Sequence, residues 1–192
     1  MTYKPKFLIG IDEVGRGPLA GPVVVAGVKL KVKNEKLKIF FGIKDSKKLS
    51  VKQRRGWFVK ITSHPKIDWA VARVWPKTID RINIARAANL GARRVYAKLA
   101  GDKLPFALLD GSLHLSRVTP HKTIIKGDEK VPAISAASII AKVTRDRIML
   151  RLHKKYPQYG FNVHKGYGTM FHRKMIKKFG RSAIHRNSFR FS

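Results

Sequence analysis

Five short apolar segments, set among longer helical stretches, constrain the fold of this chain more than any other feature. The strand-like segments are residues 6–11, 22–30, 68–74, 106–109 and 122–125. The short glycine-rich stretch 15–21 lies between the first two segments, which favours a hairpin-like pair. The order of strands and helices predicts an α/β protein, with a mixed sheet and helices packed on it.

Four helices are expected from the periodicity of apolar residues and from capping signals. Ser50 and Gln53 form a capping box, so a helix should run from there to about Thr62. A second helix should run from a cap at Thr78 to about Leu99, with an apolar side made of Ile82, Ala85, Leu90, Val95 and Leu99. The longest helix should span residues 134–156, with Ala137, Ile140, Val143 and Ile148 facing inward and a basic set of Lys142, Arg145, Arg147 and Arg151. A short helix is expected over residues 170–179.

Basic residues dominate the charged composition, with 42 Lys+Arg against 11 Asp+Glu and a formal net charge of +31. Because they are spread through the chain, we expect a folded basic surface rather than a disordered arm. Such a surface favours nucleic acid as the partner, with an anionic membrane surface as the weaker alternative. The chain has no cysteine, which excludes disulfides and thiolate metal sites. No apolar run reaches the roughly 20 residues of a membrane span and no signal peptide is evident, so we expect a soluble, cytoplasmic protein.

Four acidic residues stand where strand-like segments end. Asp12 and Glu13 follow the first segment, Asp110 follows the fourth, and Asp128 comes shortly after the fifth. Any one of these positions alone is explained equally well by a solvated turn. Together they favour a site for a hard cation such as Mg²⁺ or Mn²⁺, because oxygen-only ligation does not suit zinc. Adjacent strand residues point to opposite faces, so Asp12 and Glu13 can share one site only if the strand ends or distorts there.

Other motif-based functions are disfavoured. The sequence has neither a phosphate-binding P-loop nor an H-E-x-x-H zinc motif. Residues 15–20 fit the dinucleotide fingerprint formally, but Asp12 and Glu13 would lie near the anionic pyrophosphate. A strand also opens at Pro22, where that fold requires a helix. The glycine-rich loop is better suited to bringing backbone N–H groups and Arg16 against a nucleic-acid backbone.

Several segments resemble the type 2 ribonuclease H family, ribonuclease HII. They are residues 9–24, 45–49, 109–111, 126–128, 135–147, 159–161, 164–169 and 185–189, in the family's order across almost the whole chain. The resemblance implies a ribonuclease H-like mixed five-stranded sheet flanked by helices, with a small C-terminal helical part. It divides the chain into a catalytic domain over residues 1–156 and a substrate-contacting segment over residues 157–192.

The resemblance also implies roles for individual residues. The catalytic carboxylates, which would hold two Mg²⁺ or Mn²⁺ ions, match Asp12, Glu13, Asp110 and Asp128. The substrate-binding positions match Gly15, Arg16 and Gly17 at the ribonucleotide–deoxyribonucleotide junction, Tyr167 stacking there, and Lys47 near the scissile phosphate. The implied activity is endonucleolytic hydrolysis of RNA in RNA–DNA hybrids, and cleavage 5′ of single ribonucleotides in duplex DNA. The products would carry a 3′-hydroxyl and a 5′-phosphate.

Some positions depart from the family or leave alternatives open. Asp146 matches a common family aspartate, but Arg145 and Arg147 flank it, so we expect an ion pair or a supporting role rather than a ligand. The chain lacks the extra N-terminal domain of ribonuclease HIII and shows no obvious clamp-binding tail before Ser192. Recruitment to a replication clamp is therefore not expected. We also expect a monomer. Two rival functions are a non-catalytic basic nucleic-acid-binding protein and a nuclease of the same fold such as a junction resolvase. The clustered carboxylates argue against the first, because without a metal they would repel phosphate.

Overall fold

The computed structural model of this chain describes residues 5–32, 38–43, 45–101 and 104–190. It contains a five-stranded sheet in the spatial order β3-β2-β1-β4-β5. The strands are β1 (Phe7–Val14), β2 (Val23–Lys31), β3 (Asp68–Val74), β4 (Phe106–Asp110) and β5 (His121–Ile124). Strands β1, β2 and β3 pair antiparallel, whereas β4 pairs parallel with both β1 and β5. The mixed sheet and the hairpin of the first two strands are thus confirmed.

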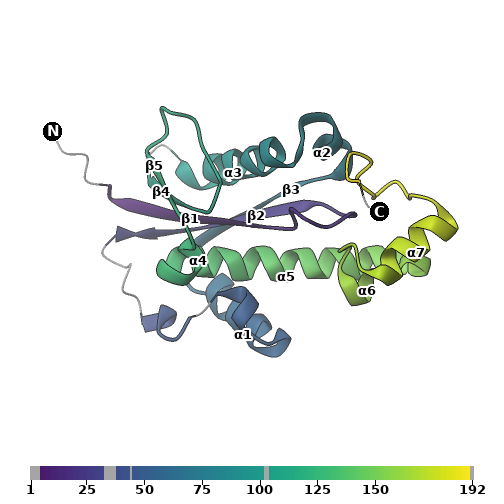
Figure 1. Cartoon of the computed structure of the whole chain (residues 1–192). Coiled ribbons are helices and arrows are strands. Elements are labelled where there is room, and N and C mark those ends of the chain that lie inside the picture. Colours follow the sequence, from purple (N-terminus) through teal and green to yellow (C-terminus); the bar gives the residue numbers. More distant parts are fainter. Residues whose placement is uncertain (1–4, 33–37, 44, 102–103, 191–192) are drawn as a thin grey trace.

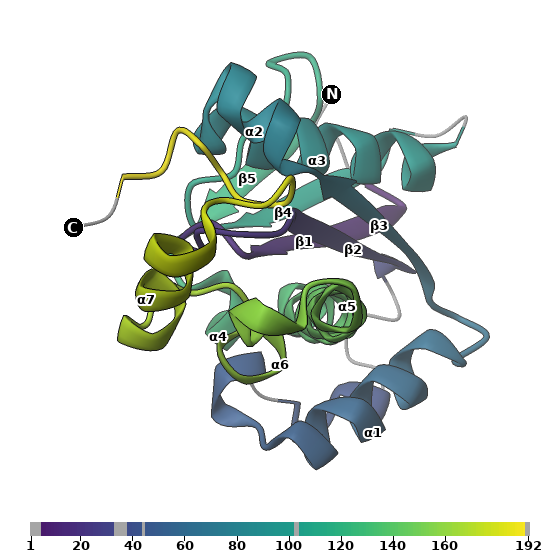
Figure 2. The same ribbon diagram turned by 90° about the vertical axis from the view of Figure 1, so that its right-hand side faces the viewer.

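Helices cover both faces of this sheet. They are α1 (Val51–Thr62), α2 (Pro76–Ile82), α3 (Ile84–Ala100), α4 (Gly127–Lys130), α5 (Pro132–Lys155), α6 (Phe161–His164) and α7 (Met170–Phe179). Single 3-10 turns are η2 (Lys38–Phe40), η3 (Ser46–Lys48) and η4 (Pro157–Tyr159). Helices α2 and α3 lie on one face and α5 on the other, with α1 beneath α5 (Figures 1 and 2).

Two apolar layers fill the space between the sheet and the helices. Leu8, Val24 and Ile140 belong to the layer on the α5 side. Ile9 and Ile11 belong to the layer on the α3 side, together with Val95 and Leu99. Each such side chain contributes about 1.5–3 kcal/mol by its burial. Successive residues of β1 therefore alternate between the two helical layers, and this alternation decides where its acidic residues point.

The capping box of α1 is confirmed. The Ser50 hydroxyl accepts a hydrogen bond from the Gln53 N–H, and the Gln53 side chain accepts one from the Ser50 N–H. Helix α7 has the bounds that its sequence predicts. In α5 the expected inward residues are also buried: Ala137, Ile140, Val143 and Ile148.

The single helix expected from Thr78 to Leu99 is wrong. Asn83 has a φ of 64°, which breaks the chain into α2 and α3, and its side chain accepts a hydrogen bond from the Arg86 N–H at 3.0 Å to begin α3. Pro76 begins α2, so Thr78 lies inside the first turn instead of capping it. Ala85, expected on the apolar side, is exposed because α3 starts with its own register after the break.

Arg145, which the sequence groups with the basic residues of α5, does not lie on the surface. Its side chain is fully buried against the segment that follows β1. Its guanidinium donates hydrogen bonds to the carbonyl oxygens of Pro22, Ala20 and Lys165. Helical periodicity could not reveal this, since the acceptors come from a loop that is distant in sequence.

The C-terminal segment packs against the end of α5 and against the loop after β1 (Figure 2). Its apolar contacts join Tyr159, Phe161 and Ile184 to Leu19 and Met149. The division of the chain at residue 156 stays a prediction. Within the described residues, no helix is long and apolar enough to span a membrane. The first four residues and residues 191–192, on which the expectations about a signal peptide and a clamp-binding tail partly rest, lie outside the described residues.

Candidate active site

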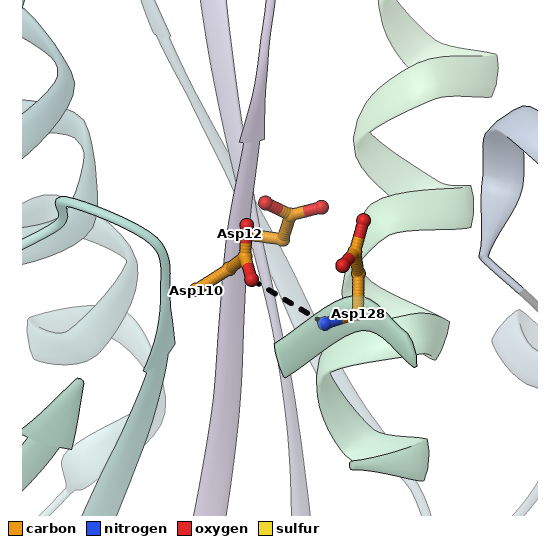
Figure 3. Close-up of side chains that lie close together, drawn as sticks. All are labelled: Asp12, Asp110 and Asp128. Atoms are coloured by element: carbon orange, nitrogen blue, oxygen red, sulfur yellow. Dashed lines mark hydrogen bonds between the residues drawn. The ribbon is translucent and has the colours of Figure 1, made fainter. Parts of the chain in front are cut away.

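Three of the four predicted carboxylates lie together at one end of the sheet. Asp12, Asp110 and Asp128 each place a carboxylate oxygen within 4.8 Å of the others (Figure 3). Strands β1 and β4 are parallel, with Ile11 opposite Leu109, so the next residue of each strand carries one aspartate on the same face. Asp128 reaches the pair from α4. Asp12 and Asp128 are each only 5% exposed, so the cluster is largely withdrawn from bulk water.

Backbone hydrogen bonds fix Asp128 relative to Asp110. The Asp110 Oδ1 atom accepts hydrogen bonds from the Gly127 N–H at 2.6 Å and from the Asp128 N–H at 3.4 Å, the second of which is drawn in Figure 3. Lys126 has a φ of 54°, and this left-handed residue turns the chain from β5 into α4. The Ser135 hydroxyl of α5 donates to the Asp128 carbonyl, which fixes α4 against α5. The carboxylates are therefore preorganised by three different elements.

The electrostatics of this cluster favour a bound cation. Burial raises the pKa of Asp12 well above its usual range, and the charges of Glu13 and Asp110 raise it further. The pKa of Asp128 is also raised, first by burial and then by the charges of Asp110 and Asp45, although Lys47 opposes this. Carboxylates that repel one another in a buried site are stabilised as anions when a divalent cation lies between them. Their all-oxygen donor set fits Mg²⁺ or Mn²⁺.

Glu13 is not part of this close cluster. Strand β1 stays paired with β2 through Val14, so Glu13 faces the α3 side while Asp12 faces α5. Its Oε1 atom lies 3.3 Å from Nη1 of Arg16. Its Oε2 atom is buried without a hydrogen-bond partner in the described part of the chain. Burial raises the pKa of Glu13, Arg16 lowers it, and the charge of Asp110 raises it, which shows that Glu13 remains within electrostatic reach of the cluster.

Lys47 lies at the open side of the cluster. Its Nζ atom is 3.5 Å from Oδ2 of Asp128, and its side chain is 80% exposed. Burial lowers the pKa of Lys47, but the carboxylates of Asp45, Asp128 and Asp12 raise it overall. The η3 turn that carries this lysine is tied to α5 by a 2.8 Å hydrogen bond between Ser46 and Ser138. Lys47 therefore places an exposed positive charge beside the carboxylates.

The glycine-rich loop and Tyr167 also come together, although they are far apart in the sequence. A Cβ atom added at Gly17 would lie 4.0 Å from the Tyr167 ring, which is partly exposed. The guanidinium of Arg16 donates hydrogen bonds to Glu13 and to the Ser112 hydroxyl. Its side chain therefore links the ends of β1 and β4 around the carboxylates.

Sequence reasoning missed several residues that surround this site. The Ser138 hydroxyl lowers the pKa of Asp12, while Asp45 accepts a hydrogen bond from the Lys47 N–H and begins η3. The segment 45–49 signalled Asp45, but nothing in the pattern of α5 singled out Ser138. Asp146 lies 2.8 Å from the Lys142 ammonium, so it forms the expected ion pair, although with Lys142 and not with a flanking arginine.

Comparisons with known proteins agree with this geometry. The sequence profile of a family described as Ribonuclease HII matches residues 9–192. A ribonuclease HII of Coxiella burnetii (strain RSA 493 / Nine Mile phase I) is 48% identical over 186 residues, covering 95% of this chain and 87% of that protein.

Two solved structures are similar over almost all of this chain. One is from the PCNA:RNase HII complex of Archaeoglobus fulgidus, with a TM-score of 0.76 and 27% identity, covering 97% of this chain and 96% of that chain. The other is Bst-RNase HIII in complex with Mn²⁺, with a TM-score of 0.77 and 23% identity, covering 98% of this chain and 68% of that chain. The second likeness concerns the fold alone. The expected fold class is confirmed.

Proposed function

This chain belongs to the ribonuclease HII family and is an endoribonuclease H, and we propose that it also cuts duplex DNA on the 5′ side of single embedded ribonucleotides. Ribonucleases H act on RNA–DNA hybrids, so hydrolysis of the hybrid's RNA strand is the general activity of the family. The products of both reactions would carry a 3′-hydroxyl and a 5′-phosphate. The observation that carries the proposal is the buried cluster of Asp12, Asp110 and Asp128 beside a glycine-rich loop.

Metal ligation at this cluster is the first part of the proposal. Asp12, Asp110 and Asp128 would hold Mg²⁺ or Mn²⁺, and the fold relative Bst-RNase HIII was solved in complex with Mn²⁺. Glu13 is proposed as a further ligand outside the close cluster, because the charge of Asp110 reaches it and its buried Oε2 atom has no hydrogen-bond partner among the described residues. A pair of ions bound there would supply activation of the attacking water and stabilisation of the leaving 3′-oxygen.

Lys47 would act on the substrate's phosphate. Its exposed ammonium lies 3.5 Å from Asp128, so it can contact a phosphate oxygen that enters the cluster. A positive charge held there before the reaction stabilises the negative charge that develops in the transition state. The neighbouring carboxylates attract the Lys47 ammonium. This attraction offsets the side-chain entropy that the lysine loses when it is held close to the cluster.

Recognition of the ribonucleotide would fall to the glycine-rich loop and Tyr167. The 2′-hydroxyl is the group that distinguishes RNA from DNA at a given site, and it can both donate and accept a hydrogen bond. Backbone N–H groups of the loop can bind that hydroxyl, and the partly exposed Tyr167 ring can stack on the neighbouring sugar. The closeness of Gly17 to the Tyr167 ring supports a single recognition surface.

A panel of labelled substrates tests the proposal. It contains a DNA duplex with one ribonucleotide, an RNA–DNA hybrid, an all-DNA duplex and an all-DNA four-way junction, each with Mg²⁺, Mn²⁺ or a chelator. We expect cutting of the first two substrates only, and only with a divalent ion. Cutting of the hybrid but not of the duplex with one ribonucleotide would refute the proposed cleavage at single ribonucleotides. Cutting of the junction would favour the resolvase alternative. The expected monomeric state stays a prediction that light scattering can measure.

A further inference from the structure

Two arginines, Arg145 and Arg186, are buried completely near the recognition loop. Neither forms an ion pair with a carboxylate among the described residues. A buried charge is costly unless hydrogen bonds replace the lost water. Burial accordingly lowers the pKa of Arg186 to about 9, with the charge of Arg145 as a further cause. Their donors must therefore be satisfied by neutral groups, and those groups are backbone carbonyls.

All three guanidinium nitrogens of Arg186 donate hydrogen bonds to the loop that follows β1. Its Nη2 atom donates to the Gly15 carbonyl at 2.6 Å and to the Gly21 carbonyl at 2.9 Å. Its Nη1 atom donates to the Arg16 carbonyl at 2.7 Å, and Nε donates to the Gly21 carbonyl at 3.1 Å. A planar fork of five donors suits this arrangement, and a lysine could not reproduce it.

Arg145 supports the same loop from the other side. It donates to the carbonyls of Ala20 at 3.2 Å and Pro22 at 3.1 Å. It also packs directly against Gly15, because a Cβ atom there would lie 2.2 Å from Nε of Arg145. The beginning and the end of the loop are thus each fixed by a guanidinium.

These contacts dictate where the loop's N–H groups point. In a trans peptide the carbonyl and the N–H of the next residue point in opposite directions, and the described residues contain no cis peptide. Because the carbonyls of Gly15 and Arg16 point inward to Arg186, the N–H groups of Arg16 and Gly17 point away from it. Within the described part of the chain, neither of these N–H groups donates a hydrogen bond to another backbone group or side chain.

We propose that Arg186 is a positioning residue for ribonucleotide recognition, which holds the carbonyls of Gly15 and Arg16 inward so that the Arg16 and Gly17 N–H groups face the substrate. This inference rests on the proposed function, since it assumes that the loop reads the 2′-hydroxyl. Arg186 does not touch the substrate itself. It acts through the orientation of two peptide groups.

Arg186 is itself anchored on the C-terminal segment. Its N–H donates to the Leu19 carbonyl at 2.8 Å, and its carbonyl accepts from Nη1 of Arg181 at 2.6 Å. The following residues, Asn187 and Ser188, donate their N–H groups to the Asp80 carboxylate of α2. The C-terminal segment is thereby held against the catalytic end of the sheet, and it supplies a side chain that shapes the recognition loop.

The test compares Arg186→Lys with a matched control, Arg54→Lys. Arg54 also donates to two backbone carbonyls, those of Ser46 and Leu49, and neither belongs to the loop that follows β1. Both variants are made in an Asp110→Asn background to prevent cleavage. Dissociation constants are then measured for a duplex with one ribonucleotide and for the matched all-DNA duplex.

Arg186→Lys should lower the preference for the ribonucleotide duplex by about tenfold, the value of roughly one hydrogen bond, with the all-DNA affinity almost unchanged. Arg54→Lys should leave the preference unchanged. An equal loss on both duplexes, or the same loss in both variants, would show that Arg186 is merely structural and overturn the proposal.

NMR of the free proteins separates this proposal from the proposed function. Arg186→Lys should shift the amide signals of Arg16 and Gly17, whereas Arg54→Lys should not. Unshifted signals in Arg186→Lys would overturn the positioning role. If the parent protein showed no preference for the ribonucleotide duplex, the proposed function would fail. The amide shifts would still show whether Arg186 sets the orientation of the loop.

If Arg186→Lys does not fold, hydrogen exchange of backbone amides in the Asp110→Asn parent protein tests the orientation of the loop instead. The Arg16 and Gly17 N–H groups should exchange rapidly in the free protein. They should become protected on the ribonucleotide duplex and less so on all-DNA duplex. Equal protection on both duplexes, or none on either, would overturn the proposal.

Discussion

Replacement of Gly15 by alanine should destabilise the protein through two separable costs. Gly15 has a φ of +93°, and an added Cβ would lie 2.2 Å from Nε of Arg145. A positive φ costs a residue with a Cβ about 1–2 kcal/mol. Overpacking a well-filled interior costs a further 1–3 kcal/mol or so. Together they give about 2–5 kcal/mol, which for a chain of this size lowers the melting temperature by roughly 4–20 °C.

Gly180→Ala is the matched control for this experiment. Gly180 has a φ of +74°, but an added Cβ would meet nothing within 4 Å, so only the backbone cost applies. Thermal and urea unfolding of both variants should show that Gly15→Ala is the more destabilising by about 1–3 kcal/mol. Equal destabilisation would mean that the Arg145 side chain moves aside without cost. The inference that this guanidinium rigidly supports the recognition loop would then be refuted.

Four further outcomes are expected. Asp110→Asn should abolish cleavage while folding and duplex binding persist, because it removes a charged ligand without changing the volume of the side chain. Near-normal turnover in saturating Mg²⁺ would contradict the assignment of Asp110 as a metal ligand. Tyr167→Ala should reduce cleavage at a single ribonucleotide by roughly 10–100-fold, through misplacement of the phosphate, and should weaken all-DNA binding far less. Equal, small effects on both would make Tyr167 a packing residue. Burial lowers the pKa of His172 and His185 to about 4, and the unfolded value is about 6.5. The stability that the two neutral histidines provide is therefore present above pH 6.5 and lost as pH falls toward 4. The free energy of unfolding should fall by at most about 1.4 kcal/mol per histidine and pH unit. Urea unfolding that gave the same free energy at pH 7.5 and pH 5 would contradict this. Binding to uncleavable duplex should weaken steeply with salt because of the +31 charge, and a flat dependence would exclude the basic surface as the docking face.

The sequence predicts the sheet and most helices because their signals are local. The capping box at Ser50 and the alternation of Asp68–Val74 need no distant partner to be recognised. The break at Asn83 was missed because the apolar pattern continues across it, and a single left-handed residue leaves little trace in periodicity. A proline at the start of α2 was the signal that could have moved the helix start from Thr78.

The close carboxylate cluster was predictable because each aspartate ends or follows a strand, and parallel neighbours bring such ends together. The orientation of Glu13 was not, since it depends on how far β1 remains regular after Asp12. The roles of Arg145 and Arg186 could not be predicted at all. A charged residue normally lies at the surface, and only the fold shows that the loop's carbonyls replace water around these two guanidiniums.

Cleavage of a DNA duplex with one ribonucleotide, measured while Mg²⁺ is titrated, tests the central claim most directly. The label is placed so that the position of the cut is read at single-nucleotide resolution. We expect no product in chelator, a rate that saturates with Mg²⁺, and one cut on the 5′ side of the ribonucleotide that leaves a 3′-hydroxyl. Cleavage that persists in chelator, or a cut that ignores the ribonucleotide's position, would contradict a metal-dependent site formed by Asp12, Asp110 and Asp128.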